Sequence, residues 1–207
     1  MAPPRLLAIA PDAWYADRNF PETLRNFAKI ADPLGADAAV YLRAHGWTVA
    51  QWLEVLNQLE RPRKLRIGVT LPVDAELPEQ SEIFSDLGVD FVHVTERDAD
   101  RPLQTWGPLQ LSRVVHAPDQ ARRRLQLGAQ WLVMSPVFAT PSKPDALPLG
   151  LMGLQQAAQS CPGRVLALGG ITPQNAESCL QNGAVGLAVQ RQAWRNPAPL
   201  IALLTNA

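Results

Sequence analysis

The sequence predicts an α/β protein that folds as a single (β/α)8 TIM barrel spanning residues 1–207. Short apolar runs alternate with longer amphipathic stretches along the chain, as repeated strand–helix units require. Four helix-to-strand joins share one form, namely Leu-Gly-Ala-Asp (34–37), Leu-Gly-Val-Asp (87–90), Leu-Gly-Ala-Gln (127–130) and Asn-Gly-Ala-Val (182–185). Each glycine can supply the left-handed residue that ends a helix before a short turn. An open, doubly wound sheet is the alternative architecture.

Eight apolar segments are the predicted strands. They are dense in Val, Ile and Leu and alternate little, which is typical of strands buried on both faces of a parallel sheet. The predicted strands are Leu6–Ala10, Ala38–Arg43, Leu65–Leu71, Asp90–Thr95, Leu109–Val115, Trp131–Phe138, Val165–Ile171 and Gly186–Val189.

Amphipathic helices are predicted between these strands, because their apolar residues recur with helical spacing. The predicted helices are Glu22–Leu34, Val49–Leu59, Asp119–Leu127 and Pro199–Leu204, with a further helix that opens at Thr172. Thr172 is a suitable N-cap residue and Pro173 a suitable first helical residue. The crossover Arg97–Pro108 is poor in helical signals.

Composition and charge exclude several classes of function. Apolar residues make up 47% and charged residues 18% of the chain, and both signs of charge count 19. This zero balance gives no electrostatic basis for binding nucleic acid or an anionic membrane. Two well-separated cysteines and three histidines indicate neither a disulfide framework nor a zinc site. The first apolar run is too short for a signal peptide, and no run approaches a membrane span.

We therefore expect a cytoplasmic protein whose partner is a small phosphorylated ligand. Function in such barrels sits where the strands run into the following loops. Three tryptophans in predicted loops, Trp47, Trp106 and Trp194, are compatible with contacts in a homo-oligomer.

The loops after the last two strands predict a phosphate site. Gly169 and Gly170 follow strand seven and allow a ligand to approach the backbone closely. The helix that begins after Thr172 offers free N–H groups, and the backbone near Gln190 follows strand eight. The alternative to phosphate binding is that the glycines only ease strand–helix packing. Arg191 also follows strand eight, but it could instead lie on the outer surface.

The long, proline-rich loop after strand six offers further phosphate ligands. Thr140 and Ser142 supply hydroxyls beside the ammonium of Lys143. Hydroxyls, backbone N–H groups and one lysine together suit a phosphate. The alternative is a stiff surface loop with a solvated lysine.

Acid–base and metal candidates follow strands two, four and five. Arg43 shares a strand face with Tyr41, and His93 and His116 are candidate general bases or, alternatively, structural histidines. Glu96 and Asp98 could hold Mg²⁺ against a diphosphate, whereas a solvated salt-bridged turn is the commoner meaning of this pattern.

Taken in order, these motifs resemble the thiamine phosphate synthase / thiazole tautomerase (TenI-like) family. Ser-Pro-Val-Phe-Ala-Thr-Pro-Ser-Lys (135–143) is similar to the synthase's Gly-Pro-Val-Phe-x-Thr-x-Thr-Lys. Ala-Leu-Gly-Gly-Ile-Thr-Pro-x-Asn (167–175) and Gly-Leu-Ala-Val (186–189) resemble its closing phosphate motifs. The resemblance covers nearly the whole chain and implies a (β/α)8 barrel. It also implies one of two activities: joining a pyrimidine diphosphate to a thiazole phosphate with Mg²⁺, or isomerising a thiazole double bond.

The chain departs from the family at the pyrimidine and metal end. The synthase motif Gln-Leu-Arg-x-Lys is Tyr-Leu-Arg-Ala-His at 41–45, which keeps Arg43 and loses the lysine. Leu71 replaces an aspartate that binds Mg²⁺ in the synthase, while Asp98 matches a retained aspartate. Val114 replaces the strand-five serine, and Pro136 stands where the tautomerase has its catalytic histidine.

Neither family active site is therefore complete. We expect a barrel of thiamine metabolism that binds a thiazole phosphate or a related phosphorylated ligand without full synthase competence. The resemblance leaves two alternatives open, namely a synthase with an altered pyrimidine pocket and a non-catalytic sensor or partner domain. His116, His93 and Arg43 are the candidate catalytic residues, and His45 is a further acid–base candidate.

Overall fold

The strands close into one parallel barrel in the computed structural model, which describes residues 2–11, 14, 17, 19–75, 79–103 and 107–206. Each strand pairs with the next along the chain, and the last closes the ring against the first with Leu6 opposite Leu187. The strands are β1 (Leu6–Pro11), β2 (Ala38–Arg43), β3 (Arg66–Thr70), β4 (Phe91–Val94), β5 (Gln110–Val115), β6 (Trp131–Met134), β7 (Val165–Leu168) and β8 (Gly186–Val189). The predicted barrel is confirmed and the open sheet is excluded.

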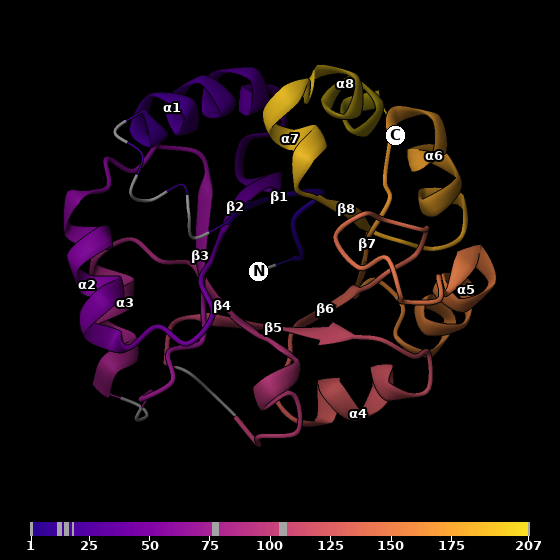
Figure 1. The fold of residues 1–207 in the computed structure, drawn as a ribbon, viewed down its shortest axis with the longest axis horizontal. Coiled ribbons are helices and arrows are strands. Elements are labelled where there is room, and N and C mark those ends of the chain that lie inside the picture. The colour runs from indigo at the N-terminus through magenta and orange to yellow at the C-terminus, as the bar shows by residue number, and fades with distance from the viewer. Residues whose placement is uncertain are drawn as a thin grey trace.

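Helices surround the barrel, as Figure 1 shows. The α-helices are α1 (Phe20–Ala31), α2 (Val49–Gln58), α3 (Glu79–Asp86), α4 (Gln120–Gln126), α5 (Gly150–Ser160), α6 (Pro173–Gln181), α7 (Arg191–Arg195) and α8 (Ala198–Asn206), with 3-10 turns η2 (Asp32–Asp37) and η3 (Glu96–Asp98). None of the helices in the described part of the chain has the length and apolar character needed to cross a bilayer.

Both faces of the strands are buried, which is why their sequences read as continuous apolar runs. The inward face forms a separate cluster of Leu7, Ile9, Ala39, Tyr41, Phe91, Trp131, Val133, Leu166 and Ala188. Gly68 leaves room for the Phe91 ring, since a Cβ at that position would overlap it. Because side chains alternate along a strand, the inward Tyr41 predicts an inward Arg43 at the strand's end.

The N-terminal segment covers the end of the barrel where the strands begin. The Arg66 guanidinium, at the start of β3, donates to the Ala2 carbonyl at 2.8 Å. A Cβ on Gly186, at the start of β8, would lie 2.7 Å from the Arg5 carbonyl oxygen. This end is therefore filled by the protein's own chain, and the opposite end is left for a ligand.

All four repeated joins turn at a glycine with positive φ. The φ values of Gly35, Gly88, Gly128 and Gly183 lie between 54° and 100°. Gly35 differs from the prediction, because its ψ of −127° lies outside the left-handed helical region and it kinks η2 instead of ending α1. Positive φ favours glycine at each join over any residue with a side chain.

One predicted helix ends earlier than its apolar pattern suggests. Helix Glu22–Leu34 is observed as α1, which ends at Ala31, and η2 takes up the remaining residues. Pro33 lacks the N–H that would continue the helix, and its ring clashes with the preceding turn.

Two predicted strands also end early. The segment Trp131–Phe138 leaves the sheet after Met134, ahead of Pro136, which cannot donate a ladder hydrogen bond. The segment Val165–Ile171 leaves it after Leu168, because both glycines that follow have positive φ. The other strands agree with the prediction to within one residue at each end.

Helices α3, α5 and α7 were not predicted. Helix α5 opens with Gly150 and carries Gly153 inside its first turns, so its helical propensity is low. Gly153 is buried, and a Cβ there would lie 3.7 Å from the side chains of both Met134 and Pro118. Tertiary packing against these residues therefore favours the helix more than its own sequence does.

The crossover between β4 and β5 is poor in helix, as predicted, and a buried arginine organises it. Among its described residues only the short turn η3 is helical. Arg113 of β5 is fully buried and donates to four backbone carbonyls. These belong to Asp98 (3.2 Å), Ala99 (2.8 Å), Arg101 (2.6 Å) and Leu127 (3.0 Å). The guanidinium takes the place of a helix in fixing the crossover to the barrel.

Candidate phosphate-ligand site

A cavity of about 270 Å³ opens at the end of the barrel where the strands finish. Nine of the ten predicted site residues line it, and Asp98 does not. The nine are Arg43, His93, His116, Thr140, Ser142, Lys143, Gly169, Gly170 and Gln190. Residues that were predicted from separate motifs, at the ends of six strands, therefore lie around one pocket.

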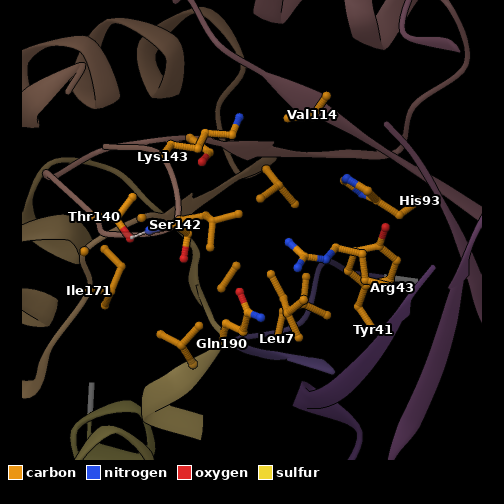
Figure 2. A pocket seen from close by; sticks show the side chains of 18 of the residues that line it. Leu7, Tyr41, Arg43, His93, Val114, Thr140, Ser142, Lys143, Ile171 and Gln190 are labelled. Carbon is orange, nitrogen blue, oxygen red and sulfur yellow. Dashed lines mark hydrogen bonds between the residues drawn. The ribbon is translucent and has the colours of Figure 1, made fainter. Parts of the chain in front are cut away.

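The pocket has two polar walls over an apolar floor. In Figure 2, Thr140, Ser142, Ile171 and Gln190 lie on one side, while Arg43 and His93 lie on the other. The floor between them is formed by Leu7, Ile9, Val133, Leu168 and Ala188. Such a division suits a ligand with a small apolar ring and one charged end.

Gly169 and Gly170 form the turn at the end of β7 and pack tightly against the loop after β6. Their φ values are 101° and 65°, and a Cβ on Gly170 would lie 2.5 Å from the Ala139 carbonyl oxygen. The Gly169 carbonyl accepts a 3.0 Å hydrogen bond from Phe138 N–H. Packing against the loop after β6 therefore requires both glycines, whereas the sequence suggested strand–helix packing as the alternative role.

The same turn still presents donors to a ligand. Within the described residues, the N–H groups of Gly169 and Gly170 donate to no carbonyl of the protein. Asn175 fixes the backbone just before α6, since its side chain accepts from Thr172 N–H at 2.8 Å and donates to the Gly170 carbonyl at 3.0 Å. Phosphate binding at this turn stays a prediction that the geometry allows.

The loop after β6 makes a compact turn around its two hydroxyls. Lys143 N–H donates to the Thr140 carbonyl at 3.1 Å, and Ser142 N–H approaches Thr140 Oγ1 at 3.4 Å. The Lys143 ammonium does not lie with these hydroxyls. In Figure 2 its side chain extends away from Ser142 and Thr140, toward the wall that holds Val114.

The Lys143 ammonium instead lies on His116. Its Nζ is 3.3 Å from His116 Nε2, and Glu96 Oε2 is 3.8 Å from the same nitrogen. His116 Nδ1 contacts the Ser135 carbonyl, so Nδ1 carries the ring proton and Nε2 carries the lone pair. The lone pair accepts from the ammonium of Lys143.

His93 is a buried, neutral histidine. Its Nδ1 is 2.9 Å from Ser112 Oγ, and its ring packs against Tyr41 with centroids 4.8 Å apart. Burial, with added repulsion from His45 and nearby arginines, lowers the pKa of His93 to about 3. Near neutral pH it is an uncharged imidazole, which suits hydrogen bonding better than proton donation.

Tyr41 closes the wall beside His93. Its hydroxyl is 2.8 Å from Thr70 Oγ1, which also accepts from Ala44 N–H at 3.1 Å. Burial raises the pKa of the Tyr41 hydroxyl well above its usual value. The tyrosine is therefore a neutral, fixed part of the wall, at the position where the synthase motif has glutamine.

The neutral state of His93 predicts a pH-dependent stability. The folded-state pKa of about 3 lies below the ordinary 6.5, so between these pH values the unfolded chain binds a proton at His93 and the folded protein does not. Acidification therefore favours the unfolded state. The stability of the folded protein is unaffected by this group above pH 6.5 and falls progressively between pH 6.5 and 3. Lowering the pH from 7 to 5.5 should cost the protein about 1 kcal/mol through His93 alone.

Urea unfolding at the two pH values measures this loss in the wild type and in His93→Gln. We expect the variant to lose less stability on acidification by that amount. Lys64→Gln is the control, because Lys64 is exposed, precedes β3 and is not among the groups that shift the pKa of His93, so it should leave the loss unchanged. An equal loss in the wild type and His93→Gln would contradict a neutral His93.

The acidic residues near the pocket do not fit a magnesium site. The Asp98 carboxylate lies 2.6 Å from Arg97 Nη2, and Asp74 Oδ1 accepts from Val49 N–H at 2.7 Å. Leu71 is buried and offers no oxygen. Throughout the described ranges, no three His, Cys, Asp or Glu side chains gather in a way that could hold a metal ion. Asp98 matches the salt-bridged turn that the sequence offered as the alternative.

Sequence reasoning missed the apolar floor of the pocket and Gln192 at its mouth. The floor residues occupy inward positions of strands β1, β6, β7 and β8, and knowing the strand faces would have identified them. Arg191 and Gln192 also line the cavity, at the start of the unpredicted helix α7. Arg191 is exposed but belongs to the pocket mouth, rather than to an unrelated outer surface.

Fold and site together define a small (β/α)8 barrel with a polar pocket at its strand ends. Comparison with protein families gives the particular group. The chain belongs to the thiamine monophosphate synthase family, whose model matches residues 6–193.

Individual relatives agree with this assignment. Thiamine-phosphate synthase of Roseiflexus castenholzii is 35% identical over 154 residues, which cover 72% of this chain and 66% of that protein. Thiamine-phosphate synthase of Chloroflexus aurantiacus is 32% identical over 158 residues, with coverage of 75% and 70%. The chain thus spans just under two thirds of the Roseiflexus castenholzii relative. Thiamine phosphate pyrophosphorylase from Pyrococcus furiosus shares the fold, with a TM-score of 0.68, 21% identity and coverage of 98% and 95%.

Proposed function

We propose that this protein binds a thiazole phosphate or a closely related phosphorylated ligand of thiamine metabolism. The observation that carries the proposal is the convergence of nine predicted residues on one cavity, with polar walls on either side of an apolar floor. The phosphate would face the turn of Gly169 and Gly170 together with Thr140 and Ser142. The ring would lie over the floor, toward Arg43.

Calorimetric titration with thiazole phosphate, thiamine phosphate and the unphosphorylated thiazole alcohol tests this proposal. We expect both phosphorylated compounds to bind and the alcohol to bind at least tenfold more weakly, roughly the effect of one charge-assisted hydrogen bond. Equal affinities for thiazole phosphate and its alcohol would show that the polar wall is no phosphate site.

The protein is expected to be a poor synthase. The Mg²⁺-dependent condensation requires metal and pyrimidine ligands, whereas Leu71 is buried and Asp98 is paired with Arg97. Mixing a pyrimidine diphosphate, thiazole phosphate and Mg²⁺ should give turnover far below 1 per second, the lower end of ordinary enzyme rates at about 1–10³ s⁻¹. The Chloroflexus aurantiacus relative is the positive control. Turnover near that of the control would instead favour a synthase with an altered pyrimidine pocket.

Proton transfer on the bound ring is the second candidate activity, and the orientation of His116 favours it. Nδ1 is held by the Ser135 carbonyl and His116 N–H is held by Gln120 Oε1 at 3.0 Å, so Nε2 is directed at the pocket. An oriented lone pair at a ligand cavity is the geometry of a general base. His93, whose pKa burial lowers to about 3, is a weak base.

Deuterium exchange into bound thiazole phosphate, followed by mass spectrometry, tests this activity. Exchange that His116→Gln abolishes would support an isomerase. Binding without any exchange would favour the non-catalytic sensor or partner domain.

A further inference from the structure

Two residues predicted for separate roles are in direct contact. Lys143 is predicted to bind the phosphate and His116 to transfer a proton, yet Lys143 Nζ lies 3.3 Å from His116 Nε2. A lone pair that accepts a hydrogen bond from an ammonium cannot at the same time accept a proton from a ligand. The contact therefore links the two roles, and its consequence for a bound ligand rests on the proposed function.

We propose that Lys143 is a positioning residue for His116 as well as a ligand of the phosphate. The ammonium covers the Nε2 lone pair until a phosphate draws it toward Thr140 and Ser142. Phosphate binding then exposes the base beside the ligand ring. Only a ligand that carries a phosphate would present its ring to an available base.

The two partners differ in how firmly they are held, which decides which of them moves. The His116 ring is fixed through the Ser135 carbonyl, and its backbone N–H is held by Gln120. Lys143 is exposed and stands on a loop, at the end of a flexible four-carbon stem. A phosphate dianion attracts the ammonium more strongly than a neutral imidazole does, so the lysine moves and the ring stays.

A carboxylate, that of Glu96, also approaches His116 Nε2. Its Oε2 lies 3.8 Å from His116 Nε2, and its Oε1 lies 3.7 Å from Arg124 Nη2. The Arg124 side chain is almost fully buried and is tied to Asp100 at 2.8 Å. When Nε2 takes a proton from a carbon of the ligand, the carbon keeps the electron pair. The new positive charge on the imidazole then faces the Glu96 carboxylate.

Acylation of His116 by diethyl pyrocarbonate measures the availability of the lone pair, because the reagent attacks an uncharged imidazole nitrogen. The rate at His116 is followed by peptide mass spectrometry, with inorganic phosphate as the probe. We expect phosphate to accelerate this reaction roughly fivefold, the factor that corresponds to releasing one net hydrogen bond. Acceleration is informative because a ligand that merely fills the pocket would shield His116 from the reagent and slow its acylation.

Variants at Lys143 separate the proposed role from a structural one. Lys143→Ala should raise the rate at His116 without phosphate to a similar extent and remove the response to phosphate. Lys143→Arg, which keeps a cationic donor, should restore slow acylation. His45 is the internal reference, since its rate should be equal in the wild type and Lys143→Ala.

Two results would overturn the inference. One is an unchanged rate at His116 in Lys143→Ala, which needs no ligand to observe. The other is a phosphate that binds by calorimetry but slows the acylation of His116 or leaves it unchanged. Failure of phosphate and thiazole phosphate to bind at all would instead remove the proposed function itself, and the ligand-driven step with it.

Discussion

Lys143→Ala is expected to weaken the binding of thiazole phosphate by about tenfold to 150-fold, while barely changing stability. A charge-assisted hydrogen bond to phosphate contributes about 1.5–3 kcal/mol, which corresponds to that range. Lys143 is exposed, and exposed lysines contribute little to folding. The loss should shrink as the salt concentration rises, because salt screens an exposed charge.

Calorimetric titration of the wild type and Lys143→Ala at low and high salt measures this effect. Lys64→Ala is the matched control, since Lys64 is also exposed but precedes β3, at the opposite end of the barrel from the pocket. Its partner is Asp32, at 2.9 Å. Equal affinities of the wild type and Lys143→Ala at low salt would mean that the loop keeps the family's sequence without holding the anion.

Arg113→Met is expected to destabilise the protein by about 3 kcal/mol, since removing one partner of a buried charged hydrogen-bond network typically costs about 3–5 kcal/mol. The substitution keeps an apolar stem and removes the guanidinium from three carbonyls of the β4–β5 crossover and from the Leu127 carbonyl at the end of α4. Relief from burying the guanidinium offsets part of the loss, because burial already lowers the pKa of Arg113 to about 10. For a chain of this length the melting temperature should fall by roughly 6–12 °C.

Thermal unfolding of Arg113→Met beside Arg123→Met tests this expectation. Arg123 is an exposed neighbour in α4 that pairs with the exposed Asp100 at 3.1 Å, so its loss should change stability by less than about 1 kcal/mol. Arg113→Lys should also be destabilised, because one ammonium cannot replace a planar guanidinium at four carbonyls. Similar melting temperatures for Arg113→Met and Arg123→Met would show that the arginine does not hold the crossover.

The sequence located the pocket better than it located the interactions within it. Gly169, Gly170 and Lys143 were identified because glycines, hydroxyls and a lysine stand at fixed distances after predicted strands. The possible role of each of these residues follows from its type and its position in the sequence. No role was predicted for Arg113, because its sequence position does not show which groups its guanidinium binds. Its four partners come from the crossover and the end of α4, and only the folded chain brings them together.

By itself the sequence determined the barrel, the family and the end of the barrel at which the pocket opens. Strand runs, helical stripes and turn glycines are local patterns, and a parallel barrel follows from their alternation. Only the tertiary structure decided that Lys143 lies on His116, 27 positions away, and that burial keeps His93 neutral. Contacts between distant segments and the desolvation of a buried ring depend on how the strands close, and no local pattern records them.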